Sequence, residues 1–440
     1  MLRSLIVILL LGIGTYGLLH GPFYGLLFYT WNAYFRPEEW LWSDTLRQIP
    51  LSFMIASYVI LASLVARNRF IINRKILLLL VFSIHAFIST LYSSYLDYSW
   101  PYLVEFFKLL IICYMMFVLV DDFQKFRLLL LIIVLSLGLE AAKQGWYYLL
   151  TKPGWPNFNP LPFLGDNNGV AVGMLMLVPT IALLAQTTHR TWARPFYWLL
   201  LTGVLYRAVS TFSRGGFVAC TLMVLLFWLH SSRKVRLLLI ILPLAALISV
   251  SLPQSFWDRM RTITTFQEDE DASALGRLHY WEVASLMARD HPALGIGFNA
   301  FSAAYDTYDY SQGKYGESRS VHNSFFGILA ELGYLGLALY LLILCLAFIS
   351  CQRVIIISRT HQELSHLMIS AKTFQISLMV FIVGGSFVAF QYFEMVWHYI
   401  VLSFILEYLT LAELNDINRG HGKTDSLHGS TVKANPIRRN

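Results

Sequence analysis

The stretch NSFFGILAELGYLGLALYLLILCLAFIS, residues 323–350, decides the fold class, because it is long and apolar and its one charged side chain is Glu331. A helix crosses the hydrocarbon core of a bilayer with about 20 apolar residues, so this stretch predicts a membrane span. Similar stretches recur along the chain. We assign further spans to residues 48–66, 76–94, 101–120, 127–150, 166–187, 195–211, 215–231, 235–252, 373–393 and 396–413.

Residues 4–35 are also apolar but are interrupted by Gly21-Pro22, so they hold one kinked span with an interfacial piece or two short spans. We take them as one uncleaved anchor, which gives about twelve spans. The composition agrees, with 57% apolar and 13% charged residues against about 45–50% and 25% in soluble proteins. The sequence therefore predicts an all-α polytopic membrane protein without a large soluble domain.

The basic residues predict the orientation of the chain, because Lys and Arg in short loops stay on the cytoplasmic side. The best orientation places twenty of the 33 lysines and arginines inside and ten outside. Basic residues held in cytoplasmic loops explain the positive net charge of +7 without a nucleic-acid partner. We therefore expect membrane lipid around the chain and no nucleic acid. Both termini are then cytoplasmic.

The spans divide the chain into N-terminal transmembrane helices (1–252), a long periplasmic segment (253–322), C-terminal transmembrane helices (323–413) and a polar cytoplasmic tail (414–440) expected to be disordered. In the periplasmic segment, apolar residues recur at helical spacing until Pro292, which predicts a helix over about 274–289 along the membrane surface. No internal repeat is obvious, which disfavours a transporter built on inverted repeats.

The first candidate site is Ser213-Arg214-Gly215-Gly216, at the outer end of two spans. The guanidinium of Arg214 offers a planar fork of donors that matches phosphate oxygens, although an arginine that snorkels to the headgroups is an equal alternative. Arg207 lies about two turns deeper on the same helical face, where we expect a structural ion pair. Glu140 and Lys143 are expected to pair with each other.

The periplasmic segment carries the next candidates. Arg259, Arg261 and Arg277 supply further cations, and anchoring at the membrane interface is the alternative for each. The four tyrosines of this segment offer either sugar-stacking faces or a membrane belt. They are Tyr305, Tyr308, Tyr310 and Tyr315.

His322-Asn323-Ser324 marks the return of the chain to the membrane. A neutral histidine is a natural general base, so His322 is a candidate catalytic residue, with an interfacial role as the alternative. Asn323 or Ser324 is a suitable helix cap. Glu331 lies more than two turns into the span, where a carboxylate is costly, and we expect it to pair with an arginine.

Gly165-Asp166-Asn167-Asn168-Gly169 follows a proline-rich outer connection. Asp166 and Asn167 suit contacts with sugar hydroxyls, while turn and cap chemistry explains them equally well. The four cysteines, with no C-x-x-C and no clustered histidines, indicate neither a disulfide framework nor a zinc site. We therefore expect no metal and no cofactor.

Several of these motifs, taken in order, resemble the O-antigen ligase family and its O-glycosylation ligase relatives. They are Ser-Arg-Gly-Gly at 213–216, Gly-Arg at 276–277 with Trp281, His291-Pro292, Gly295-Ile296-Gly297-Phe298, and His322-Asn323-Ser324-Phe325 with Glu331-Leu332-Gly333. The start of the chain resembles the branch associated with exosortase systems, through Gly21-Pro22-Phe23, Tyr29-Thr30-Trp31 and Arg36-Pro37. The resemblance covers roughly residues 1–413.

The resemblance implies a polyprenol-dependent glycosyltransferase of the inner membrane with about twelve spans. Such a protein transfers a finished glycan from undecaprenyl diphosphate to lipid A core or to a protein Ser/Thr at the periplasmic face, without a metal. By motif, Arg214 and Arg277 match the diphosphate-binding arginines, His322 matches the catalytic histidine, and Arg259 or Arg261 matches a further arginine. In the outer motif, Asp166-Asn167-Asn168 stands where the family commonly has a proline.

Three functions remain open at this point. A ligase is favoured, and an O-antigen polymerase, which takes a second lipid-linked glycan as acceptor, would use the same arginines. A polysaccharide transporter is the rival from another class, with Glu140, Lys143 and Arg207 along its path. For the transferases, the absence of an identifiable protein nucleophile favours direct displacement with inversion.

Overall fold

The computed structural model describes residues 2–40, 48–161, 163–231, 233–236, 238–239, 242–243, 246, 252–265 and 272–429. Within these ranges every regular element is a helix, which confirms the all-α class. The elements are α1 (Leu2–Leu18), α2 (Pro22–Phe35), η1 (Pro37–Glu39), α3 (Leu51–Val65), α4 (Arg74–Leu91), α5 (Leu96–Leu119), α6 (Phe123–Thr151), α7 (Asn167–Thr187), α8 (Ala193–Val209), α9 (Arg214–His230), α11 (Gln254–Thr265), α12 (Ala272–Asp290), α13 (Phe301–Tyr308), α14 (Ser324–Ser358), η3 (Gln362–Leu364), α15 (Ser365–Gly384) and α16 (Glu394–Gly429).

Among the described residues, six helices are long and apolar enough to cross a membrane: Arg74–Leu91, Leu96–Leu119, Asn167–Thr187, Ser324–Ser358, Gln362–Gly384 and Glu394–Arg419. Exposed apolar side chains run along the flanks of α4, α5 and α14, as at Leu77, Leu80 and Ile84 of α4. A row of exposed apolar side chains is typical of a surface that faces lipid. The chain is therefore a multi-pass membrane protein. Further apolar helices at Ser4–Leu18, Leu51–Val65 and Arg214–His230 are shorter, and the expected span 235–252 lies mostly outside the described residues, so the count of about twelve spans stays a prediction.

The interruption predicted at Gly21-Pro22 is confirmed. Helix α1 ends at Leu18, Gly21 has a φ of 116°, and α2 begins at Pro22. Proline suits the first position of a helix, where its missing N–H has no partner to lose. Residues 4–35 thus form two separate helices, α1 and α2, which pack against each other.

Helix α7 lies at the centre of the bundle, with 94% of its apolar stretch buried. It packs against α6, α8, α9 and α15. Small residues allow this close approach, since a Cβ at Gly384 of α15 would lie 2.7 Å from the Val172 side chain of α7. The first turns of α7 and α9 are therefore set in a packed frame.

Helix α14 is kinked at Gly333, whose φ of 69° and ψ of −173° are not helical. The loop after α12 fills the gap: the N–H groups of Ile296 and Gly297 donate to the carbonyls of Ala330 and Glu331, both at 3.0 Å. A kink inside a membrane helix is tolerated where such partners satisfy the freed backbone groups. A Cβ at Gly295 would lie 2.4 Å from the Glu331 carbonyl carbon, so only glycine fits there.

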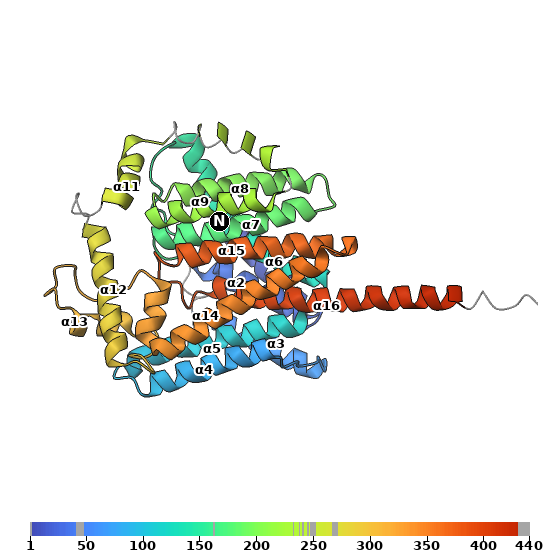
Figure 1. The fold of residues 1–440 in the computed structure, drawn as a ribbon, viewed down its shortest axis with the longest axis horizontal. Coiled ribbons are helices and arrows are strands. Elements are labelled where there is room, and N and C mark those ends of the chain that lie inside the picture. The colour runs from blue at the N-terminus through green and yellow to red at the C-terminus, as the bar shows by residue number, and fades with distance from the viewer. Residues whose placement is uncertain are drawn as a thin grey trace, which may run out of the picture.

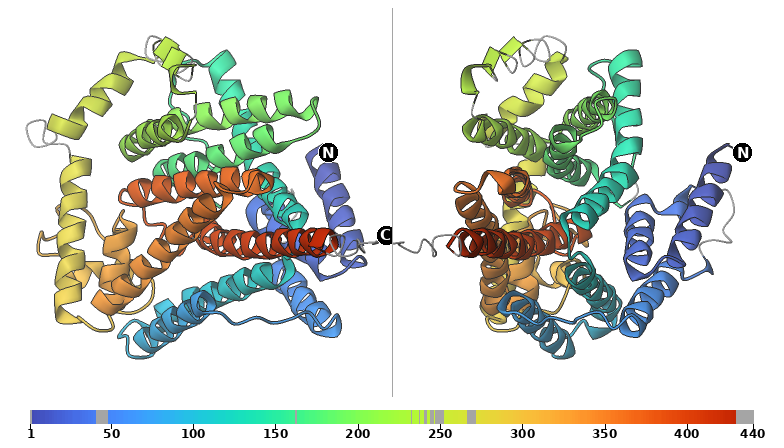
Figure 2. Two further views of the ribbon diagram at one scale, coloured as in Figure 1. Left: turned by 45° about the vertical axis from the view of Figure 1, so that its right-hand side comes forward. Right: turned by 90° about the vertical axis from the view of Figure 1, so that its right-hand side faces the viewer.

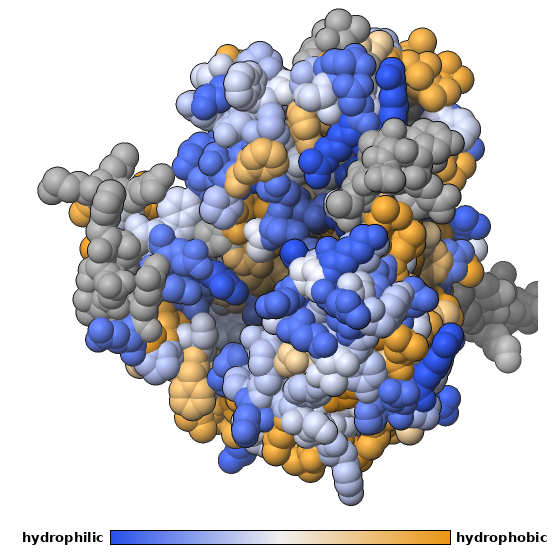
Figure 3. Space-filling view, turned by 90° about the vertical axis from the view of Figure 1, so that its left-hand side faces the viewer, coloured by the Kyte–Doolittle hydropathy of each residue, from blue (hydrophilic) through white to orange (hydrophobic). Residues whose placement is uncertain are grey.

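The helix predicted over 274–289 is confirmed as α12, Ala272–Asp290. It runs roughly at right angles to α4, α14 and α15 and crosses one end of the bundle (Figure 1). Figure 3, which looks onto this end, shows mostly hydrophilic side chains. This arrangement is the one expected of a helix outside the hydrocarbon core.

The prediction of a disordered tail from residue 414 is wrong over its first part. Helix α16 continues to Gly429 and projects from the end of the bundle opposite α11 and α12 (Figure 2). Extension of an existing helix needs no new nucleus, and Leu411-Ala412-Glu413-Leu414 are strong helix formers. Residues 430–440 lie outside the described residues.

Candidate functional site

His322 occupies the turn that leads into α14. Its φ of 48° lies in the left-handed region, which costs a non-glycine residue of order 1–3 kcal/mol and persists only where the surrounding structure fixes it. The next residue, Asn323, caps the helix by accepting from the N–H groups of Phe325 (2.9 Å) and Phe326 (3.1 Å). Asn323 is thus the predicted cap, and His322 is free of that role.

A second turn, residues 385–388, supports both ends of the site. Asn323 Nδ2 donates to the Ser386 carbonyl at 3.0 Å. On the other side, the backbone of Gly215 packs directly on Phe387, because a Cβ at Gly215 would lie 2.5 Å from the Phe387 Cβ. The neighbours of His322 and of Arg214 therefore rest on the same turn, which explains the glycine after Arg214.

Arg214 is the first residue of α9 and is 9% exposed. The preceding Phe212 has a φ of 54°, and Ser213 caps the helix by accepting from the Gly216 N–H at 3.1 Å. The N-terminus of a helix carries partial positive charge that favours anions. A buried arginine at this position adds a full cation to it.

The first turns of α9 and α7 are joined by hydrogen bonds. Ser213 Oγ donates to Asn168 Oδ1 at 2.8 Å, and Asn168 Nδ2 donates to Asp166 Oδ2 at 3.2 Å. Asp166 also caps α7 by accepting from the Gly169 N–H at 2.8 Å. Asp166 is exposed and Asn167 half-buried, so the structure supports the cap role of Asp166 and leaves a contact with substrate as a prediction.

Helix α12 brings Arg277 to His322. Trp281 Nε1 donates to the Val321 carbonyl at 3.2 Å, and the Trp281 ring stacks on Phe326 at 5.6 Å between centroids. The Tyr280 ring lies 6.3 Å from the His322 ring. These contacts hold α12 against the turn that carries His322.

The electrostatic surroundings of His322 join three segments of the chain. Burial lowers the pKa of His322 below its ordinary value; Arg277 and Arg319 lower it as well, whereas Asp166 raises it. A lowered pKa keeps the imidazole neutral near pH 7, as a general base must be. Arg319 was not among the residues predicted from the sequence, although its position three residues before His322 is a signal that could have suggested it.

Arg259 and Arg261 lie on α11 and are both exposed. The helix is attached to the start of α9 through Phe256, which packs on Phe212 at 5.0 Å between ring centroids. Arg261 forms an ion pair with Asp258 at 3.8 Å. The geometry does not choose between the two arginines as the further family residue.

In the part of the chain that the structure describes, Glu331 pairs with no arginine, so the expected ion pair is wrong. Its carboxylate, 2% exposed, accepts from Gln391 Nε2 at 3.2 Å and from the Phe301 N–H at 3.4 Å. Neutral donors stabilise a buried carboxylate without a second charge to desolvate. Glu331 thus holds the kinked part of α14 to α13 and to the turn before α16.

The ion pair expected for Arg207 is likewise absent among the described residues, and that prediction is wrong. This fully buried side chain donates to Gln144 Oε1 (3.0 Å) and to the carbonyls of Asn157 (3.2 Å) and Asn159 (2.6 Å). It fixes the proline-rich connection before α7 to the bundle. The predicted Glu140–Lys143 pair is present.

The tyrosines of the segment 253–322 differ in exposure. Tyr305 is fully buried, so it supplies neither a sugar-stacking face nor a belt, whereas Tyr310 is 57% exposed. Among the described residues, no group of three or more His, Cys, Asp or Glu side chains is placed to hold a metal ion.

Together, the helical membrane bundle, the buried arginine at the N-terminus of α9 and the histidine beside further arginines form a candidate anion-binding site of a membrane protein. Residues 197–341, about a third of the chain, match the family model described as O-antigen ligase. The match contains Arg214, Arg277 and His322, and it confirms the resemblance to that family and supports a membrane function of O-antigen ligase or polymerase type. The exosortase-associated branch stays a prediction. A comparison with curated proteins found no match.

Proposed function

We propose that this protein transfers a preassembled glycan from undecaprenyl diphosphate to an acceptor hydroxyl at the periplasmic face of the bacterial inner membrane. The acceptor is lipid A core or a protein Ser/Thr. The observation that carries the proposal is the placement of His322 in the electrostatic field of Arg277, Arg319 and Asp166, within a segment that matches the O-antigen ligase family.

His322 serves as the general base in this proposal. The acceptor oxygen forms a bond to the anomeric carbon as its proton passes to His322, and the bond from that carbon to the diphosphate oxygen breaks. One displacement inverts the anomeric centre. The left-handed turn at His322, fixed by the Asn323 cap and Ser386, keeps the imidazole in place during this step.

The arginines stabilise the leaving group. Undecaprenyl diphosphate gains negative charge as the glycosyl bond breaks, and donors that are already in position lower the energy of that state. Arg214 at the N-terminus of α9 and Arg277 on α12 hold the diphosphate, and Arg319 adds positive charge beside His322. Arg259 or Arg261 on α11 is proposed as a further contact, and Asp166, Asn167, Asn323 and Glu331 as the surrounding substrate-binding or supporting residues.

The test is turnover by the purified protein in detergent, with lipid-linked glycan from the source bacterium and either lipid A core or acceptor protein. We expect a new glycosidic linkage and release of undecaprenyl diphosphate. Lengthened lipid-linked glycan without added acceptor would identify a polymerase. Absence of any new covalent product would contradict a transferase and leave transport.

A further inference from the structure

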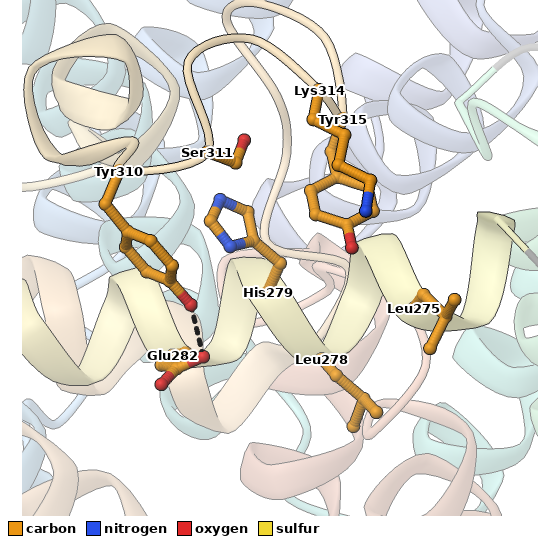
Figure 4. A pocket seen from close by; sticks show the side chains of 8 residues that line it. All are labelled: Leu275, Leu278, His279, Glu282, Tyr310, Ser311, Lys314 and Tyr315. Carbon is orange, nitrogen blue, oxygen red and sulfur yellow. Dashed lines mark hydrogen bonds between the residues drawn. The ribbon is translucent and has the colours of Figure 1, made fainter. Parts of the chain in front are cut away.

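The outer side of α12 bears a hollow of about 470 Å³, which the proposed transfer step does not use. Figure 4 shows His279 and Glu282 of α12 on one side of it, and Tyr310, Lys314 and Tyr315 of the loop between α13 and α14 on the other. Sites for small ligands commonly measure about 300–1,000 Å³. The hollow is therefore large enough for part of a glycan.

A buried pair of side chains fixes the floor of the hollow. His279 Nε2 donates to Asp309 Oδ1 at 2.7 Å, and both side chains are nearly inaccessible. Asp309 also accepts from the N–H groups of Ser311 and Gly313, each at 2.8 Å. Burial alone would raise the pKa of Asp309, but the hydrogen bonds from Ser311, Gly313 and His279 lower it below its ordinary value. These hydrogen bonds fix the loop that begins at Asp309 against α12, so the lining of the hollow is ordered.

The lining combines aromatic rings with charged groups of both signs. The His279 ring lies 4.6 Å from the Tyr310 ring and 4.9 Å from the Tyr315 ring. The Tyr310 hydroxyl donates to Glu282, and the charge of Glu282 is matched by Lys314 across the hollow. Sugars present apolar C–H faces, which aromatic rings cover, and hydroxyls, which carboxylate and ammonium groups bind. A neutral saccharide suits this lining better than an anion.

The position on α12 specifies which part of the glycan would bind. At 100° per residue, His279 and Glu282 lie on nearly the opposite face of the helix from Arg277 and Trp281. A helix with its side chains is about 10–12 Å across. A glycan held by its diphosphate at Arg277 must therefore pass the helix before it reaches the hollow.

We propose that the hollow is a carbohydrate subsite that binds sugar units of the donor glycan remote from the diphosphate. The proposal rests on the proposed function, because the donor defines which end of the glycan is near Arg277. It gives the protein a means to favour finished glycans over short ones.

The experiment compares two donors: the lipid-linked glycan extracted from the source bacterium and undecaprenyl diphosphate that carries a single sugar. With Tyr310→Ala we expect kcat/KM to fall about tenfold for the extracted donor, the equivalent of one good contact, and less than twofold for the single-sugar donor. Tyr310→Phe, which keeps the ring, should retain most of the activity. Tyr92→Ala, which removes an 80% exposed tyrosine outside the hollow, is the matched control.

A second measurement needs no turnover. The glycan is released from its lipid by mild acid and titrated calorimetrically into the detergent-solubilised wild type and Tyr310→Ala. We expect binding that Tyr310→Ala weakens about tenfold. If Tyr310→Ala lowered kcat/KM equally for both donors, or if the free glycan did not bind to an active wild type, the subsite would be overturned. Failure of the wild type to turn over either donor would instead contradict the proposed function.

Discussion

Ser213 Oγ donates a hydrogen bond to Asn168 Oδ1 at 2.8 Å, which joins the cap of α9 to the first turn of α7. The same Ser213 oxygen accepts from the Gly216 N–H and so caps α9, and Asn168 continues to Asp166. The bond therefore sets the start of α9, where Arg214 lies, relative to the carboxylate that acts on His322. Ser213 therefore both caps α9 and positions Arg214 relative to Asp166.

Ser213→Ala tests whether the hydrogen bond between Ser213 and Asn168 positions the start of α9 for donor binding. Loss of a cap costs about 1 kcal/mol of stability, and Asp122→Ala at the start of α6, where Asp122 caps through the Lys125 N–H, should cost about the same. Only Ser213→Ala should also raise the KM for the lipid-linked donor, because it frees the first turn of α9. Equal donor KM values in the two variants would show that the Asn168 bond has no part in binding.

Charge-conserving substitutions test the diphosphate contacts. Arg214→Lys and Arg277→Lys keep the charge but lose the planar fork that matches phosphate oxygens, so both should lower kcat/KM by about tenfold or more, the loss of one strong contact. Arg190→Lys, at an exposed arginine between α7 and α8, is the control. Full activity of both variants at matched membrane levels would restore the snorkelling alternative.

The pH dependence tests the surroundings of His322. A base is active when neutral, so activity is lost as the pH falls through its pKa, and the lowered pKa places this loss below the ordinary histidine value of about 6.5. Arg319→Gln removes a charge that lowers the pKa, so the acid limb of kcat/KM should move to higher pH. Asp166→Asn removes a charge that raises it, and the limb should move to lower pH.

The opposite directions make this prediction specific. Asparagine can still cap α7, so Asp166→Asn should keep the fold, and thermal unfolding checks that it does. Two shifts of the same sign, or unchanged profiles in both variants, would show that the group that titrates is not His322.

The elements that the sequence predicts well are those with local signals. Helix α12 was expected from a helical period that Pro292 stops, and the Asn323 cap from its place before an apolar run; both signals lie within a few turns of the feature. Glu331 and Arg207 were misjudged for the opposite reason. The sequence predicts that a buried charged side chain has a partner, but it does not show which residue that partner is. The neutral partners found here, such as Gln391 and the Asn157 carbonyl, come from segments 50 to 60 residues away.

In the candidate site, too, residues in local motifs were predicted and residues brought together only by the fold were not. Arg214, Arg277 and His322 were found because each belongs to a short motif. Arg319 and the His279–Asp309 pair belong to no motif, and their significance appears only when the loop folds back over α12. Packing of the 385–388 turn against both Gly215 and Asn323 could not be read from local pattern either.

Single-cysteine labelling tests the predicted orientation. Labels at Ser255 and Tyr315 should react from the periplasm, and labels at Asn68 and Ser426 only after the inner membrane is opened, as the uneven distribution of Lys and Arg requires. Ser255 is exposed at the start of α11, and Asn68 follows α3. Reaction of Tyr315 from the cytoplasm would reverse the orientation and place the site on the wrong face for a periplasmic transfer.

The initial rate of transfer per folded molecule of His322→Asn, alongside the affinity for the lipid-linked donor, tests the central claim. Asparagine tolerates the left-handed backbone of this turn but cannot take up a proton, and Asn323 still caps α14. With His189→Asn, an exposed site after α7, as the control, we expect the rate to fall on the order of 10²–10⁴-fold while donor affinity stays near that of the wild type. A rate close to wild type in a folded His322→Asn protein would contradict the assignment of His322 as the general base.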